Sequence, residues 1–147
     1  MIDVHSHLHS DRADAMLDEQ TQRERNYFIR YSTDEGRVWG RRFFEKIAPK
    51  MVSLDERIED LDRMGIDMQM VTPRPTQKHY WIEAALAEEI AGIENDNVAE
   101  SVHRHPDRFF GICTLPLQDT DRALNELDRA VGTLGLKGIL ISTSVGP

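Results

Sequence analysis

Apolar and polar positions follow two alternating periods from residue 53 to the end of the chain. Three stretches carry apolar residues three or four positions apart, which places them on one face of a helix; they cover residues 54–64, about 81–102 and about 120–134. Three shorter apolar runs are typical of buried strands; they cover residues 66–72, 109–115 and 138–142. Strands separated by amphipathic helices predict right-handed crossovers and a parallel sheet.

Several of these helices and strands begin or end at residues that are suited to helix caps or to strand termination. Ser53 and Glu56 have the spacing of a capping box, in which the serine hydroxyl accepts from an early helical N–H group. Gly65 follows the first of these helices and is suited to a left-handed ending. Pro73-Arg74-Pro75 ends the next strand, because proline cannot donate to a ladder. A short strand over residues 2–5 brings the number of strands to four, and the last of them lacks its helix.

Residues 11–50 show no clear period. The stretch is rich in Arg, Asp, Glu and Gln, with scattered aromatic residues that include Trp39 and Phe43. We expect an irregular insertion, with or without short helices, that lies over the ends of the strands. Single aromatic residues of this kind belong to a core more often than to a pocket.

Composition narrows the range of partners. The formal net charge of −8 argues against nucleic acid and anionic membranes, because both need a positive surface. No stretch approaches the roughly 18 consecutive apolar residues of a membrane helix, and residues 1–5 do not resemble a secretory signal. Cys113 is the one cysteine, so an internal disulfide is excluded, which favours the cytoplasm. Small molecules are the expected partners, and a homo-oligomer is left open.

The sharpest chemical feature is His5-Ser6-His7 at the end of the first strand. Residues two positions apart project to the same side of a strand, so both imidazoles should emerge together at its carboxyl end. This arrangement suits two ligands of a divalent ion such as Zn²⁺. His9 continues the pattern but falls in the following loop, and Asp3 is expected on the same face as a buried polar partner. The alternative is a surface loop that contains histidines by chance.

Five short motifs follow one another along the chain: Met1–His7 with its H-x-H, Leu61–Asp67, His105–Phe109, Leu115–Asp119 and Leu134–Gly138. Together they resemble the amidohydrolase superfamily, in the amidohydrolase-related branch that contains aminocarboxymuconate-semialdehyde decarboxylase. The resemblance covers residues 53–146 well and does not extend to residues 11–50. It implies an α/β fold, the N-terminal portion (about four βα units) of a TIM-type (β/α)8 barrel within residues 1–147, with His5 and His7 as metal ligands.

The resemblance also implies groups that lie outside these residues. Members of the branch complete the metal site with a histidine from a middle strand and an aspartate from the last strand, and many use another histidine as acid/base. These groups are expected beyond Pro147, because a barrel of this kind needs about 250 residues. Either a longer polypeptide or a second chain would supply them. We expect the 147 residues alone to be inactive and to bind Zn²⁺ weakly or not at all.

Two further residues lie on the same rim of the expected sheet. Arg74 stands between two prolines after the second strand, and its guanidinium could bind a substrate carboxylate through two parallel hydrogen bonds. An exposed arginine in a turn is the alternative. His79 lies in the loop after the same strand, where contact with substrate or metal competes with a solvated position.

The expected chemistry follows from the resemblance. It implies a divalent ion, zinc first and manganese as the alternative, and a small carboxylated substrate. A bound ion lowers the pKa of a water molecule, which serves decarboxylation, hydrolysis and hydration alike. Because the resemblance is to a decarboxylase branch, we expect non-oxidative decarboxylation of an unsaturated or aromatic carboxylate. A metal-dependent hydrolase or hydratase and an inactive truncated half-barrel are the alternatives.

Overall fold

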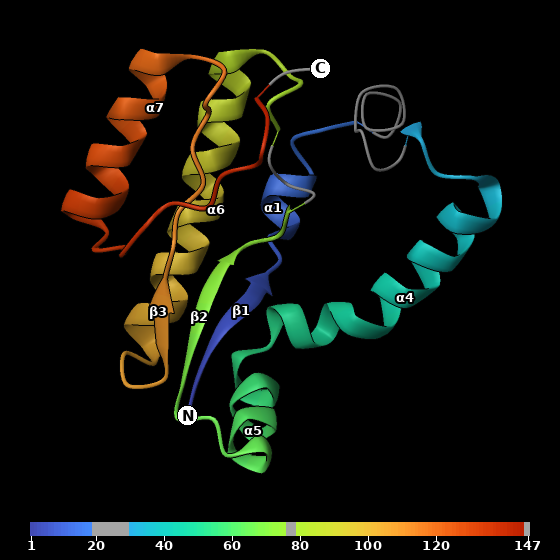
Figure 1. Cartoon of the computed structure of the whole chain (residues 1–147), viewed down its shortest axis with the longest axis vertical. Helices are drawn as coiled ribbons and strands as arrows, with labels where there is room; N and C mark the ends of the chain where they lie inside the picture. Colours follow the sequence, from blue (N-terminus) through green and yellow to red (C-terminus); the bar gives the residue numbers. More distant parts are fainter. Residues whose placement is uncertain (19–29, 76–78, 146–147) are drawn as a thin grey trace.

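The computed structural model describes residues 1–18, 30–75 and 79–145 and contains a parallel sheet with helices packed against it (Figure 1). The three strands lie in the order β1-β2-β3 and span Ile2–Leu8, Met68–Pro73 and Phe109–Gly111. Beyond β3, Ile139 forms a parallel bridge to Cys113. The expected α/β architecture with parallel strands is confirmed.

Helices alternate with the strands along the chain. The segments are α1 (Asp11–Asp14), α4 (Asp34–Val52), α5 (Leu54–Met64), α6 (Ala84–Arg104) and α7 (Thr120–Leu127), which continues as the π-helical η2 (Asp128–Thr133). Figure 1 shows α1 just past the upper end of β1, and α4 extending away from the sheet. Among the described residues, no helix has both the length and the apolar content to cross a membrane.

Helix α5 begins and ends where the sequence predicts. Ser53 Oγ accepts from the backbone N–H of Glu56 at 3.3 Å, which satisfies one of the unpaired donors of the first turn. Gly65 follows the helix with a φ of 67°, and its N–H donates to carbonyl groups of the last turn. The two caps fix the length of the helix that packs beside β1.

Gly65 offers a local test of this ending. An alanine with a φ of 67° brings its Cβ close to the following carbonyl, so we expect Gly65→Ala to lower the free energy of unfolding by about 1 kcal/mol. Gly40 in α4 has no atom within 4 Å of an added Cβ, so Gly40→Ala should leave stability unchanged or raise it. Urea unfolding of both variants measures the difference, and equal effects would contradict the left-handed cap.

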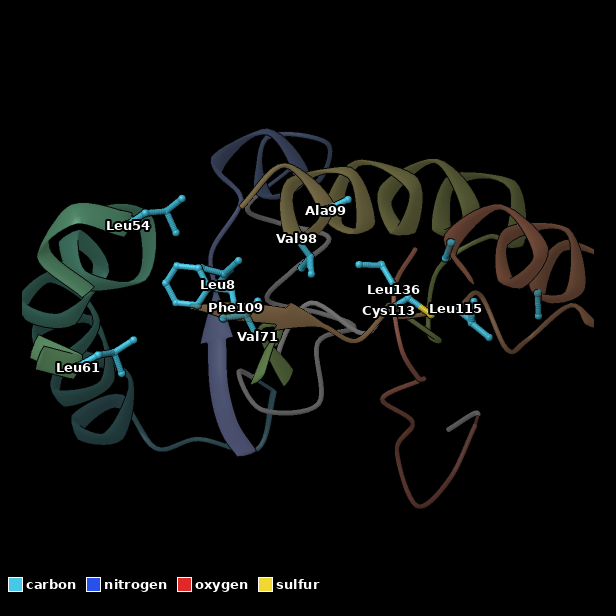
Figure 2. Close-up of a cluster of buried hydrophobic side chains, with 12 residues drawn as sticks. Leu8, Leu54, Leu61, Val71, Val98, Ala99, Phe109, Cys113, Leu115 and Leu136 are labelled. Carbon is cyan, nitrogen blue, oxygen red and sulfur yellow. The ribbon is translucent and has the colours of Figure 1, made fainter. Parts of the chain in front are cut away.

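The hydrophobic core lies between the strands and the helices α5 and α6 (Figure 2). Leu61 of α5, Val71 of β2 and Phe109 of β3 are each at most 1% exposed. Gly111 is a point of close approach, because an added Cβ would lie 2.6 Å from side-chain atoms of both Val98 and Leu136. This packing holds α6 and the carboxyl ends of the strands in a fixed relation.

Three elements differ from the sequence prediction. The strand expected over residues 109–115 ends at Gly111, and the one expected over 138–142 is reduced to the bridge at Ile139. The segment around Ile139 still has the place and direction of a parallel strand, because Cys113 N donates to Gly138 O and Leu140 N donates to Cys113 O. The helix expected to reach residue 134 changes to π-helical geometry at Asp128.

The stretch expected to be irregular contains α4, a helix of 19 residues. All of α4 is described, and none of its residues is buried. Trp39 and Phe43 stack on each other with ring centroids 5.2 Å apart, 67% and 48% exposed, so they are not part of the core. A helix with no buried residue needs no apolar period, so the pattern of apolar positions carries no signal for α4. Residues 19–29 of the insertion lie outside the described residues.

Candidate metal centre

The strand β1 contains one irregularity. Asp3 pairs with Gln69 and Ser6 pairs with Val71, so β1 has one residue more than β2 between the two pairs. This is the two-against-one count of a β-bulge, which bends a strand and changes the side to which its residues point. Simple alternation along β1 is therefore interrupted between Asp3 and Ser6.

His5 and His7 lie together at the carboxyl end of β1. Their ring centroids are 5.2 Å apart, and the ring planes are inclined at 82°. His5 is exposed and His7 is half-buried, with Nδ1 of His7 3.2 Å from Thr72 Oγ1 of β2. The strand continues to Leu8, so both histidines lie within it; His7 is paired with Thr72 of β2, whereas His5 lies in the bulge.

Asp3 does not share the face of the two histidines, contrary to the expectation. Its Oδ2 accepts from Gln69 Nε2 at 2.7 Å, and Gln69 Oε1 accepts from Arg57 at 3.0 Å. Arg57 also donates to Ser6 Oγ at 3.2 Å, so Asp3, Ser6 and Gln69 form one polar row facing α5. The bulge is the reason, because one extra residue shifts the alternation. Asp3 is thus a half-buried polar residue whose side-chain partner is Gln69.

Arg57 attaches the end of β1 to the helices beside it. Its Nη2 donates to the backbone oxygen of His7 at 2.8 Å and to that of Lys50 at 2.9 Å. Burial lowers the pKa of this guanidinium, while the charges of Asp3 and Asp60 oppose the change. The backbone of His7 is therefore held from the helix side while its ring contacts β2.

A second cluster forms where α1 approaches the end of β2. Nε2 of the buried His9 lies 2.9 Å from Asp11 Oδ1 and 3.6 Å from Asp14 Oδ2. Arg74 Nη2 donates to both carboxylate oxygens of Asp14, at 3.1 and 2.9 Å, and Arg74 Cζ lies 4.5 Å from the ring centroid of Phe44. Arg74 is thus not an exposed turn residue, because a carboxylate and an aromatic ring already surround its guanidinium.

His79 lines a separate cavity of about 10 Å³, together with Glu94 of α6 and Gln118. It is a buried residue and not a solvated one, and neither of its ring nitrogens nor either carboxylate oxygen of Glu94 has a hydrogen-bond partner among the described residues. Burial lowers the pKa of His79 to about 4 and raises the pKa of Glu94 well above its usual value. Asp14 raises the pKa of both groups and Arg74 lowers it, by smaller amounts.

A larger cavity of about 290 Å³ lies beside α4 and α5. Its charged lining residues are Lys50, Arg57 and Asp60, and His7 borders it. His5 is not part of its lining, and Arg57 of α5 contacts the helix-facing side of β1. This cavity is therefore not the space above the paired imidazoles.

The two imidazoles fit part of a metal site, because imidazole nitrogen is a ligand for zinc and other first-row divalent ions. Within residues 1–18, 30–75 and 79–145, no group of three or more His, Cys, Asp or Glu side chains is placed to hold an ion. His9 and His79 therefore do not complete a site around His5 and His7. This part of the chain offers two ligands.

Thr72 and Arg57 support this pair but belong to none of the sequence motifs described above. Arg57 follows Leu54 by three residues and precedes Leu61 by four, so it lies on the buried face of α5. A charged residue on the buried face of a helix indicates a side chain with polar partners in the fold, and this was the signal for Arg57 in the sequence. Thr72 is a polar residue near the carboxyl end of β2, and its partner becomes visible only with the register of β1 and β2.

Enzymes with a (β/α)8 barrel have their active sites at the carboxyl ends of the strands, and imidazole is a common zinc ligand, so the position of His5 and His7 fits a metal site of such a barrel. The chain belongs to the amidohydrolase family, whose profile Amidohydro_2 matches residues 2–147. This confirms the family that the sequence motifs indicate.

Individual relatives agree with this assignment. The chain is 36% identical over 104 residues to 2-amino-3-carboxymuconate-6-semialdehyde decarboxylase of Dictyostelium discoideum, over 71% of this chain and 29% of the relative. It is 38% identical over 101 residues to gamma-resorcylate decarboxylase of Rhizobium radiobacter, over 68% of this chain and 31% of the relative. The chain therefore spans about a third of the length of the curated relatives it matches.

A solved structure confirms the fold class. It is a dihydroxybenzoic acid decarboxylase from Polaromonas sp. JS666, with bound manganese and the inhibitor 2-nitroresorcinol. Its TM-score to this chain is 0.69 at 24% identity, over 96% of this chain and 37% of that one. The chain thus has the fold of the N-terminal part of a barrel of this kind.

Proposed function

We propose that this chain is the N-terminal, metal-binding part of a non-oxidative decarboxylase that acts on an unsaturated or aromatic carboxylate. The observation that carries the proposal is the pair of imidazoles, with centroids 5.2 Å apart, at the carboxyl end of β1 in a chain of the amidohydrolase family. The relatives named above are decarboxylases by name, which favours loss of CO₂ over hydrolysis or hydration.

In this proposal, His5 and His7 hold a divalent ion and Arg74 binds the carboxylate of the substrate. When bound, the ion supplies stabilisation of negative charge on substrate oxygens. Arg74 Nη2 already contacts both oxygens of one carboxylate, that of Asp14, so a substrate carboxylate would exchange with Asp14 at a preformed position. No acid/base group is assigned within the described residues.

The identity of the ion and the location of the protein are part of the proposal. Zinc is the ion expected from the histidine ligands, and the manganese in the Polaromonas decarboxylase supports manganese as the alternative. The thiol of Cys113 is buried, and burial raises its pKa to about 11, which fits an unreactive structural cysteine in the cytoplasm. A homo-oligomeric state stays a prediction.

Nuclear magnetic resonance of the 147-residue chain in the presence of Mn²⁺ tests the ligand pair. We expect Mn²⁺ to broaden the ring signals of His5 and His7 first, with weak affinity because two imidazoles are fewer ligands than a stable site requires. His5→Ala should remove the effect at His7, and His7→Ala should remove it at His5. His103→Ala, in the last turn of α6, is the control and should change neither. Broadening at His103 as strong as that at His7 would refute the pair.

The reaction is tested on the polypeptide encoded by the reading frame continued past codon 147. We expect it to release CO₂ from an unsaturated or aromatic carboxylate such as 2,6-dihydroxybenzoate when loaded with Zn²⁺ or Mn²⁺. Hydrolysis of an amide or ester, or hydration of a double bond, without any release of CO₂ would overturn decarboxylation.

A further inference from the structure

We propose that Thr72 is a positioning residue that fixes the tautomer of His7, so that Nε2 is the ring nitrogen able to bind a metal ion. The hydrogen bonds that set the tautomer are contacts within the chain. Only the binding of a metal ion at Nε2 rests on the proposed function.

The Thr72 hydroxyl lies between two groups in a buried position. Thr72 is 1% exposed, and its Oγ1 lies 2.8 Å from the backbone oxygen of Pro73 and 3.2 Å from Nδ1 of His7. A hydroxyl has one hydrogen to donate and two lone pairs that accept. Because a carbonyl oxygen can only accept, the contact with Pro73 uses the one hydrogen of Thr72. Oγ1 can then only accept from His7.

This arrangement determines where the hydrogen of the neutral imidazole lies. Nδ1 of His7 must carry it in order to donate to Thr72 Oγ1, which leaves the lone pair on Nε2. The opposite tautomer would turn a lone pair of Nδ1 toward a lone pair of Oγ1. Metal-binding histidines are commonly oriented in this way, by a hydrogen bond from the ring nitrogen that does not bind the ion.

The backbone holds both partners in place. His7 and Thr72 are directly paired in the register of β1 and β2. Arg57 Nη2 donates to the backbone oxygen of His7 at 2.8 Å from the helix side. Thr72 therefore meets a ring whose backbone position is fixed independently, and its hydroxyl acts on the orientation and the tautomer of that ring.

The tautomer is measured by nitrogen-15 magnetic resonance of the metal-free 147-residue chain at about pH 8.5, where an imidazole of ordinary pKa is neutral. We expect the Nδ1–H form of His7 to dominate in the wild type and in Thr72→Ser, which keeps the hydroxyl. Thr72→Val keeps the branched shape and removes the hydroxyl, so the share of the Nδ1–H form of His7 should fall. An unchanged Nδ1–H form in Thr72→Val would overturn the inference.

A Mn²⁺ titration of the same three proteins adds the functional consequence. Thr72→Val should need about 10- to 100-fold more Mn²⁺ than the wild type for equal broadening of the His5 and His7 signals. Thr72→Ser should stay close to the wild type, and equal Mn²⁺ requirements for all three proteins would contradict the positioning role. If Mn²⁺ broadens no histidine of the wild type, the ligand pair fails within these 147 residues, whereas the tautomer measurement still decides the role of Thr72 and the CO₂ assay on the longer polypeptide decides the reaction.

Discussion

Replacement of Arg57 by methionine should lower the free energy of unfolding by about 3 kcal/mol. Its guanidinium donates to Ser6 Oγ, to Gln69 Oε1 and to the backbone oxygens of His7 and Lys50. Methionine fills similar apolar space but removes the guanidinium from the part-buried contacts with Ser6, Gln69 and His7 and from the exposed contact with Lys50. A hydrogen bond to a charged group contributes roughly 1.5–3 kcal/mol, and the loss of a buried network is among the most damaging single changes.

Two variants separate the network from charge alone. Arg57→Lys keeps the charge, but one ammonium group cannot reach acceptors on both β1 and β2, so we expect most of the loss to remain. Arg63 lies on the same helix and is 71% exposed, and its ion pair with Asp60 should contribute less than about 1 kcal/mol. Urea unfolding compares Arg57→Met with Arg63→Met. A loss below about 1 kcal/mol for Arg57→Met would show that the network does not hold β1.

The elements predicted well are those whose causes are local in the sequence. The ends of α5 depend on Ser53 and Gly65, which act within one helical turn. The parallel order of the strands follows from the alternation of strands with amphipathic helices, and the placement of His5 and His7 follows from the position of β1 in that order. The caps of α5 are thus decided within one helical turn, whereas the strand order is decided by a pattern of apolar positions that is itself visible along the chain.

The features that were missed depend on contacts between distant segments. The bulge that moves Asp3 away from the histidines is defined by the pairing of β1 with β2, about 65 positions later in the chain, and cannot be read from alternation within β1. The spacing of Ile90, Glu94 and Val98 places a carboxylate on the buried side of α6. That spacing is visible in the sequence, but the lack of a partner for Glu94 appears only once the helix is packed.

Glu94 leads to a second large effect, a dependence of stability on pH. Burial raises the pKa of Glu94 in the folded chain well above its usual value of 4.5, and Asp14 raises it further while Arg74 opposes. A group whose pKa is raised on folding stabilises the fold fully at a pH below the unfolded pKa. That contribution is lost as the pH rises toward the folded pKa, at up to about 1.4 kcal/mol per pH unit.

His79 acts in the opposite direction over a lower range of pH. Burial lowers its pKa from 6.5 to about 4, so its contribution is complete above pH 6.5 and is lost as the pH falls toward 4. Between about pH 4.5 and 6.5 the two groups therefore oppose each other. Above pH 6.5 only Glu94 changes the stability in this cavity, and the wild type should become less stable as the pH rises further.

Glu94→Gln removes this ionisation while keeping the shape of the side chain. Its stability relative to the wild type should increase by up to about 2 kcal/mol between pH 6.5 and 8, because only the wild type must keep a buried carboxyl group protonated. Glu100→Gln, at an exposed position of the same helix, should show no such trend. Urea unfolding at pH 5, 6.5 and 8 measures both differences. A constant difference between Glu94→Gln and the wild type across this range would mean that the Glu94 carboxylate is as well accommodated as in water, and that the cavity shared with His79 does not exclude charge.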